Sequence, residues 1–377
     1  MECEAGEMQH VVGMALKLAS SGGQGDVYKC FKLLGNKLYA TNCASCGEFN
    51  LPEGIVFDEE VLVDARQMSS VVKYLTGKIA IIVETGRIQI KDGRGEYKLL
   101  RASGAMATPE DQPDDDAFVH ANHIVPCLLI AKTYVSSGTN AIRAFEGIIL
   151  KGGEIIASDG EMMFHTSVEA ETGPAVILSA QEIPVLHKAT QTKIGMSSGR
   201  VYFKYKDAVI SVPQVNAQYP RSVHSVIDSG WDVHCEIDRQ EIHNAIRQCL
   251  SLANSEDSTF IKVNLEGNGE KMSVESHSPK GEILVNIACS AEHPISCSIN
   301  GFMFNKFLSN AHTKSIGISK CSSGRKSIRC RSRLPGACGD NIFGVFIGEV
   351  GTETTGEQNE SPRQNGTDAD QESPERF

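Results

Sequence analysis

The residues that could do chemistry in this sequence are dispersed. Cys43 and Cys46 have the spacing of half a zinc site, but no second close cysteine pair accompanies them. The glycine-rich segment 20–26 (SSGGQGD) lacks the lysine and hydroxyl residue of a phosphate-binding loop. No Ser-His-Asp order is evident, and the eleven histidines are scattered. We therefore predict a protein that is not an enzyme and holds no metal or cofactor, with the two cysteines as ordinary reduced thiols.

One turn has a composition suited to binding a partner. The segment 152–164 (GGEIIASDGEMMF) predicts two strands joined at residues 158–160, because an Asp-Gly pair between apolar runs is typical of a hairpin. Met162, Met163 and Phe164 follow the turn. Methionine adapts its shape to different ligands, so this hairpin is a candidate to present an apolar surface.

The same hairpin pattern occurs three times along the chain. Ala40, Ala157 and Val274 occupy equivalent positions in the three copies and stand at equal intervals. Each copy is followed by a helical segment and a Gly-Arg turn that leads into a strand: Gly86-Arg87, Gly199-Arg200 and Gly324-Arg325. We expect an α+β fold of three tandem repeats, each with two helices covering antiparallel sheet.

The helices that must carry these repeats can be placed from apolar spacing and terminal residues. They are expected at 8–23, 64–77, 122–138, 179–190, 238–254 and 300–312. The acidic, proline-containing segment 103–117 predicts a linker, and residues 351–377 are too polar to form a core and are predicted to be disordered. The resulting domains are 1–117, 118–227 and 228–350, followed by an acidic tail at 351–377.

Composition is that of a soluble globular protein. The chain has 377 residues, of which 41% are hydrophobic and 22% charged, with a net charge of −11. No run of about 18 apolar residues occurs, so we predict no membrane span. The acidic start, MECEAGEMQH, differs from a secretory signal, and we expect a cytoplasmic protein.

The predicted helices carry basic and short polar residues opposite their apolar stripes. These basic positions are Lys17, Arg66, Lys73, Lys132, Lys188, His243, Arg247 and Lys306. Sparse cations among serine and asparagine, without aromatic stacking residues, indicate a surface that faces phosphate without reading bases. A solvated helix face is the simpler interpretation for any single helix, but the same bias recurs on several.

Four segments together resemble the bacterial DNA polymerase sliding clamp, the β subunit of DNA polymerase III. They are 63–75 (VDARQMSSVVKYL), 79–100 (IAIIVETGRIQIKDGRGEYKLL), 143–164 (RAFEGIILKGGEIIASDGEMMF) and 218–223 (QYPRSV). The order and spacing of these segments carry the resemblance, which runs from about Met8 to Val350. It implies a non-catalytic head-to-tail homodimer, a ring of six domains that encircles double-stranded DNA without sequence preference and slides along it.

The resemblance also implies partners and sites. The partners would be DNA polymerase with its exonuclease, the clamp loader and repair proteins, at the nucleoid in the cytoplasm. Their peptides would bind a cleft formed by Phe145, Ser158, Gly160, Met162, Met163, Pro220, His224, Phe307, Val345 and Phe346. The dimer interface would include Tyr97, Leu99 and Leu252.

Some positions depart from the family pattern. Glu161 and Met162 stand where the family usually has His-Arg, and Gln24 and Gln181 stand where basic residues are frequent. The alternative is therefore a clamp-like adaptor that binds partner peptides without being loaded on DNA.

Overall fold

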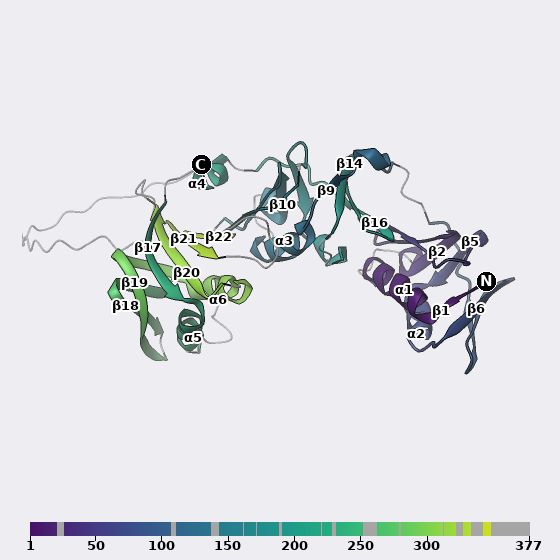
Figure 1. Ribbon diagram of the computed structural model, residues 1–377, viewed down its shortest axis with the longest axis horizontal. Helices are drawn as coiled ribbons and strands as arrows, with labels where there is room; N and C mark the ends of the chain where they lie inside the picture. The colour runs from purple at the N-terminus through teal and green to yellow at the C-terminus, as the bar shows by residue number, and fades with distance from the viewer. Residues whose placement is uncertain are drawn as a thin grey trace, which may run out of the picture.

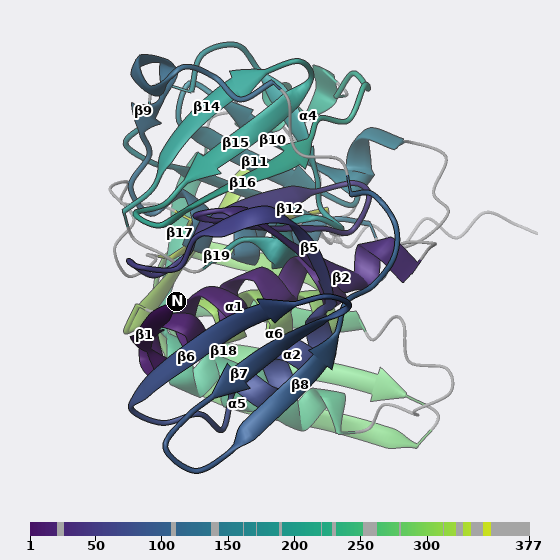
Figure 2. The same ribbon diagram turned by 90° about the vertical axis from the view of Figure 1, so that its right-hand side faces the viewer.

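The helices and strands follow one another along an arc. The structure is a computed structural model that describes residues 1–20, 26–106, 111–136, 143–160, 162–170, 172–187, 191–219, 221–227, 231–251, 262–278, 280–311, 313–321, 327–332 and 342–347. Figure 1 shows helices α1, α2, α3, α5 and α6 along the inner side of this arc, with strands outside them and α4 on the outer side. Figure 2, viewed from the right-hand end of the arc, again shows α4 high and α1, α2, α5 and α6 lower.

One order of elements recurs along the chain: a strand, a helix, four strands, a second helical element and three strands. The first stretch holds β1 (Glu2–Glu4), α1 (Ala5–Ser20), η1 (Asp26–Lys29), β2 (Cys30–Gly35), β3 (Lys37–Thr41), β4 (Cys46–Asn50), β5 (Phe57–Asp64), α2 (Ala65–Val72), β6 (Lys78–Glu84), β7 (Arg87–Lys91) and β8 (Glu96–Leu100). The additional element η1 is one short 3₁₀ turn.

The second stretch has the same order with weaker helices. It holds η2 (Asp115–Ala117), β9 (Val119–His120), α3 (Ile124–Ala131), η3 (Lys132–Tyr134), η4 (Arg143–Glu146), β10 (Gly147–Lys151), β11 (Glu154–Ser158), β12 (Met162–Ser167), β13 (Val176–Ser179), η5 (Ile183–Val185), β14 (Lys193–Ser197), β15 (Arg200–Lys204) and β16 (Ala208–Pro213). Helix α4 (Arg221–Ile227) follows and leads to the third stretch.

In the third stretch, two long strands stand where the other stretches have four short ones. Its elements are β17 (Trp231–Asp238), α5 (Arg239–Leu250), β18 (Lys262–Ser278), β19 (Gly281–Asn300), α6 (Gly301–Asn310), β20 (Ser315–Cys321), β21 (Ser327–Ser332) and β22 (Ile342–Ile347). Register shifts between Gly267 and Lys271 interrupt the β18–β19 ladder, so each long strand still has two parts.

Two of the three sheets continue from one stretch into the next. An eight-stranded sheet has the order β5-β2-β3-β4-β16-β15-β14-β9, and a ten-stranded sheet has the order β13-β10-β11-β12-β22-β21-β20-β17-β19-β18. Thus β4 pairs with β16, and the equivalent strand β12 pairs with β22. The remaining sheet, β1-β6-β7-β8, ends at β8.

The helices begin where the sequence places capping residues. Asp64 accepts a hydrogen bond from the Gln67 backbone N–H at 2.8 Å, and Asp238 accepts two at the start of α5. Asn300 caps α6 in the same way. Each cap satisfies backbone donors that the first helical turn leaves open, so these short helices are fixed at their N-termini.

The helix expected at 179–190 is wrong over the described residues, where only the single turn η5 forms. The side chain of Glu182, which precedes this turn, accepts hydrogen bonds from Asn42 and Ser45 at 2.7 Å each. It therefore caps no helix, and Leu186 already has an extended backbone. A tertiary contact thus replaced a local signal.

Candidate functional site

The turn between β11 and β12 is fixed by its own side chains. The Ser158 hydroxyl donates to the Met162 carbonyl at 2.9 Å and accepts from the Gly160 N–H at 3.1 Å. The Asp159 carboxylate accepts from the Met162 N–H at 2.7 Å. Gly160 has φ +97°, a conformation that suits glycine, and a Cβ there would lie 3.3 Å from Phe145 Cε2. The turn and the Phe145 ring therefore form one surface.

An apolar cluster lies on the outer face of the β10–β13 sheet, beside this turn. Its buried members are Ile149, Ile156, Met163, Ile177 and Val223, and Phe145, Val215, Ala217, Tyr219, Val226 and Ile227 pack against them partly exposed. We call these eleven residues the outer cluster. The Phe145 and Tyr219 rings meet edge to face at 5.6 Å. Partly exposed apolar and aromatic groups around a small core are what an apolar peptide side chain could contact.

The structure separates the two methionines that the sequence placed together. Met163 is 5% exposed and belongs to the outer cluster, whereas Met162 is 1% exposed in the main core with Phe164. Successive side chains on a strand point to opposite faces, so only one of two adjacent residues can line a given surface. The assignment of Met162 to the cleft wall is therefore corrected.

Phe307 requires a similar correction. It is 1% exposed and stacks on Phe304, with ring centroids 6.2 Å apart, inside the main core. The helical spacing that directs Phe304 inward also directs Phe307 inward. It supports α6 from below and does not belong to the outer cluster.

The remaining predicted cleft residues are only partly placed. His224 is half-buried on α4, next to Val223 of the outer cluster. The backbones of Val345 and Phe346 pair with Met163 and Met162, which brings the last strand to this edge. Pro220 and Glu161 lie outside the described residues, as do the side chains of Val345 and Phe346.

Tyr219 is a member of the outer cluster that the sequence did not single out. Burial raises its pKa, so the phenol stays neutral at physiological pH. Its signal was its place directly before the proline of the QYPRSV segment.

Lys306 links the turn to the inner side of the arc. Its ammonium lies 5.8 Å from the centroid of the Tyr134 ring, within reach of a cation–π contact. Burial lowers the pKa of Lys306, and the Asp159 carboxylate in the turn opposes that shift. This predicted DNA-facing residue therefore also contacts the second stretch of the chain.

Most of the other predicted basic positions that the structure describes lie on or directly after helices of the inner side (Figure 1). Arg66, Lys73 and Arg247 are exposed on or directly after their helices, as is Lys17 on α1. Lys132 is half-buried in η3, and Lys188 lies outside the described residues. Helices α1, α2, α3, α5 and α6 together carry five basic and two acidic side chains. These helices thus carry a small excess of basic residues in an acidic chain.

His243, a predicted phosphate-facing residue, is engaged by the neighbouring helix α6. Its Nε2 is 3.1 Å from Asn305 Oδ1 on α6. Burial lowers the pKa of His243, and Arg239 and Arg247 lower it further. The imidazole therefore joins α5 to α6 mainly in its neutral form at physiological pH.

Two strand edges are open at opposite ends of the arc. Strand β8 is the last strand of its sheet, and its edge is open up to Arg101, which makes one isolated bridge to Val63 of β5. On β19, β17 pairs only with residues 289–291, so residues 281–288 have no neighbour on that side among the described strands. Each edge carries an exposed leucine: Leu100 is 74% exposed and Leu284 is 61% exposed.

The predicted interface residues face inward on β8. Leu99 is buried and Tyr97 packs partly against the main core. The side chains of both residues therefore contact the core of their own chain and are not presented to a strand that pairs with β8. Leu252 lies outside the described residues. What β8 offers to a neighbour is its backbone together with Leu100.

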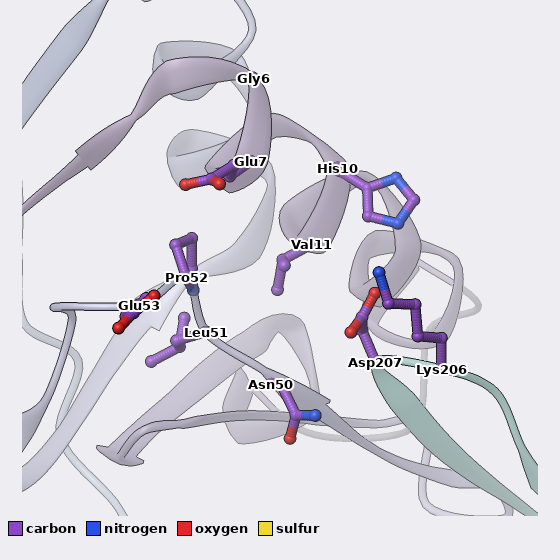
Figure 3. Close-up of a pocket in the computed structure, with 10 residues that line it drawn as sticks. All are labelled: Gly6, Glu7, His10, Val11, Asn50, Leu51, Pro52, Glu53, Lys206 and Asp207. Carbon is purple, nitrogen blue, oxygen red and sulfur yellow. The ribbon is translucent and has the colours of Figure 1, made fainter.

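A pocket of about 480 Å³ lies where α1 approaches the β15–β16 turn. Figure 3 shows Glu7 and Glu53 on one side of it and His10, Lys206 and Asp207 on the other. None of the residues predicted from sequence lines it. Its mixed charges favour no one class of ligand.

The described residues hold no group of three or more His, Cys, Asp or Glu side chains placed to bind a metal ion. Cys43 and Cys46 are free thiols, the first exposed and the second half-buried. Among the helices of the described ranges, none has the length and apolar content needed to cross a membrane.

Comparison with solved structures identifies the fold. The chain is similar to a putative DNA polymerase III β subunit from Eubacterium rectale, at 12% identity and TM-score 0.77, covering 92% of this chain and 98% of that one. It is also similar to the β subunits from Pseudomonas aeruginosa (16%, TM-score 0.77) and Thermotoga maritima (16%, TM-score 0.75), each covering 93% of this chain and 99% of the other. The chain has the sliding-clamp fold. Comparisons with protein-family models and with curated proteins find no match.

The clamp fold accounts for the placement of the sites. Helices α1, α2, α3, α5 and α6 lie on the inner side, and sheets that run from one stretch into the next lie outside them. The outer cluster, on the opposite face of the sheet from α3, is therefore separated from the inner side by the thickness of the sheet.

Proposed function

We propose that this protein is a divergent member of the DNA polymerase III β family and works as a DNA sliding clamp. Two chains form a ring around duplex DNA, and the ring tethers a polymerase and repair proteins without catalysing a reaction. The observation that carries the proposal is the clamp fold over 93% of the chain, with the basic helices on its inner side.

The pairing rule inside the chain supports ring closure. Strand β4 of the first stretch pairs with the last strand of the second, and β12 of the second pairs with the last strand of the third. By the same rule, residues 281–288 of β19 pair with β8 of another chain. Both edges are open, and edge pairing between copies satisfies backbone groups that would otherwise remain exposed. Three clamp domains, at 1–117, 118–227 and 228–350, then meet three of a second copy.

A mildly basic inner side suits a sliding ring. Encirclement holds the protein on DNA, so strong phosphate contacts are unnecessary and would slow movement. The excess of basic residues on the inner helices attracts the backbone without reading sequence. The acidic remainder of the chain disfavours DNA on the outer side.

The outer cluster is the proposed docking site for partner peptides. It combines a preformed turn at 158–160, the Phe145 and Tyr219 rings, and apolar side chains of α4. Clamp loader, polymerase, exonuclease and repair proteins are the proposed owners of such peptides, acting at the nucleoid in the cytoplasm.

Retention on circular DNA tests the proposal. The protein, loaded on a nicked circular plasmid and passed through a sizing column, should stay with the DNA and leave when a restriction enzyme linearises the plasmid. Equal retention on circular and linear DNA would show contact binding and refute the ring. Peptide binding with no retention on either DNA would identify an adaptor that is not loaded.

A further inference from the structure

We propose that the acidic segment 351–377 docks on the inner face of α5 and α6 and competes with DNA for that face. The docking follows from the position and charge of the segment. The competition rests on the proposed function, because it requires DNA to occupy the inner side of the ring.

The segment leaves the fold close to this face. Phe346, one residue before the end of β22, pairs with Met162, the first residue after the β11–β12 turn. The Lys306 ammonium of α6 lies 5.8 Å from the centroid of the Tyr134 ring, and this ring lies 5.2 Å from that of Phe164, two residues after Met162 on β12. The last described residue of the chain, Ile347, therefore lies close to the part of β12 that Lys306 approaches.

The charges of the two surfaces are complementary. The segment carries seven acidic and two basic residues, with the first three acids at Glu353, Glu357 and Glu360. Helices α5 and α6 carry Arg239, Arg247 and Lys306 against a single acid, Glu241. Arg239 donates to the carbonyls of Thr313 and Leu308, so the exposed cations are Arg247 and Lys306.

The length of chain is sufficient for the contact. From Ile347 to Glu360 the chain can span at most about 45 Å, whereas the ten residues of α6 extend over only about 15 Å. A tethered partner acts at an effective concentration in the millimolar range, so weak ion pairs suffice. Such pairs are screened by salt, which makes the contact releasable by DNA.

Zero-length crosslinking of the full chain tests the docking without DNA. A carbodiimide should link Glu353, Glu357 or Glu360 to Lys306, as identified by mass spectrometry, and the link should disappear in Lys306→Gln. Lys151 and Lys206 are exposed on other parts of the surface and serve as internal controls. Links to these two lysines as frequent as links to Lys306 would overturn the proposal.

Binding of a linear 30-base-pair duplex tests the competition. A chain ending at Val350, and a full chain with its seven tail acids changed to Gln or Asn, should both bind about tenfold more tightly at low salt. The difference should vanish in high salt. Unchanged affinity in both variants would overturn competition, and a change only in peptide binding would place the segment on the outer cluster instead.

The two proposals fail separately. If the crosslinks form but the protein is not retained on circular DNA, the docking stands and the ring fails. If the protein is retained on circular DNA, but no crosslinks to Lys306 form and the duplex affinity does not change when the segment is altered, the clamp function stands and the docking fails.

Discussion

At the scale of single residues, the β11–β12 turn depends on one backbone position. Gly160 has φ +97° and faces Phe145 at a distance that leaves little room for a methyl group. Gly173 has φ +68°, and nothing lies within 4 Å of the place that a methyl group would take there, so it shares the backbone conformation without the ring contact. Comparing substitutions at these two glycines therefore distinguishes the effect of backbone strain from the effect of displacing the Phe145 ring.

Gly160→Ala should therefore weaken peptide binding more than Gly173→Ala. Both changes should cost roughly 1–2 kcal/mol of stability through the left-handed backbone. Only Gly160→Ala should also lower the affinity for a peptide selected to bind the unmodified protein. The expected loss is about fivefold, or about 1 kcal/mol of binding free energy. Titration calorimetry together with thermal unfolding measures both effects. Equal peptide affinity in the two variants would remove the turn from the binding site.

At the scale of elements, a half-buried histidine joins α1 to the segment directly after the turn η5. The His187 Nε2 lies 3.1 Å from the Met14 carbonyl, and its ring packs edge to face on Tyr205 at 5.9 Å. Burial lowers the pKa of His187 to about 4, and the nearby Lys17 and His10 act in the same direction. The imidazole is therefore neutral in the folded protein at physiological pH and donates to the carbonyl.

This contact should make stability depend on pH. Because the folded pKa of about 4 lies below the ordinary value of 6.5, the unfolded chain binds a proton first as the pH falls. The contribution is fully present above pH 6.5 and is lost as the pH falls toward 4, by at most roughly 3 kcal/mol. Urea unfolding between pH 7 and 4 should show a smaller loss in His187→Gln, which keeps a donor but does not titrate. His120→Gln, at an exposed position, is the control. The same slope in all three proteins would exclude His187 as the cause.

At the scale of the whole molecule, ring closure depends on backbone donors of β8. The Arg101 N–H donates to the Gly86 carbonyl at 2.9 Å, toward the neighbouring strand. Alternate residues of an antiparallel strand point their N–H groups to opposite sides, so the N–H groups of Lys98 and Leu100 face the outer edge, which Val63 of β5 meets only at Arg101. Leu100 is well suited for a test, since its side chain is mostly exposed.

Leu100→Pro should weaken the dimer, because proline removes one outward donor at the edge. Leu100→Ala keeps that donor and loses only the apolar contact, so it should weaken the dimer less. Analytical ultracentrifugation should show a dissociation constant raised at least about tenfold by proline. A dimer of unchanged strength in Leu100→Pro would place the interface elsewhere, while circular dichroism verifies folding of each variant.

Much of the local structure followed from the sequence. The Asp-Gly turn at 159–160, the caps Asp64 and Asp238 and the strand after the Gly86-Arg87 turn each depend on residues close together in the chain. The three-fold recurrence of hairpins and helices, and the resemblance to the clamps, followed from the order of such local signals. The fold class could therefore be predicted before any contact was known.

Tertiary structure decided which face each of these residues occupies. Met162 and Met163 are equally apolar. They differ because the sheet lies between the main core and the outer cluster, so that Met162 faces the core and Met163 faces the outer cluster. The residues around Glu182 in the chain predict a helix. In the structure its carboxylate accepts hydrogen bonds from Asn42 and Ser45, which are far away in the chain. The residues around Lys306 in the chain predict an ordinary exposed lysine. In the structure its ammonium instead lies over the Tyr134 ring and within reach of the Asp159 charge. Local hydrogen bonds and periodicity depend on residues that are neighbours in the chain. The burial of a side chain and the residues that it contacts depend on which segments, far apart in the chain, pack together.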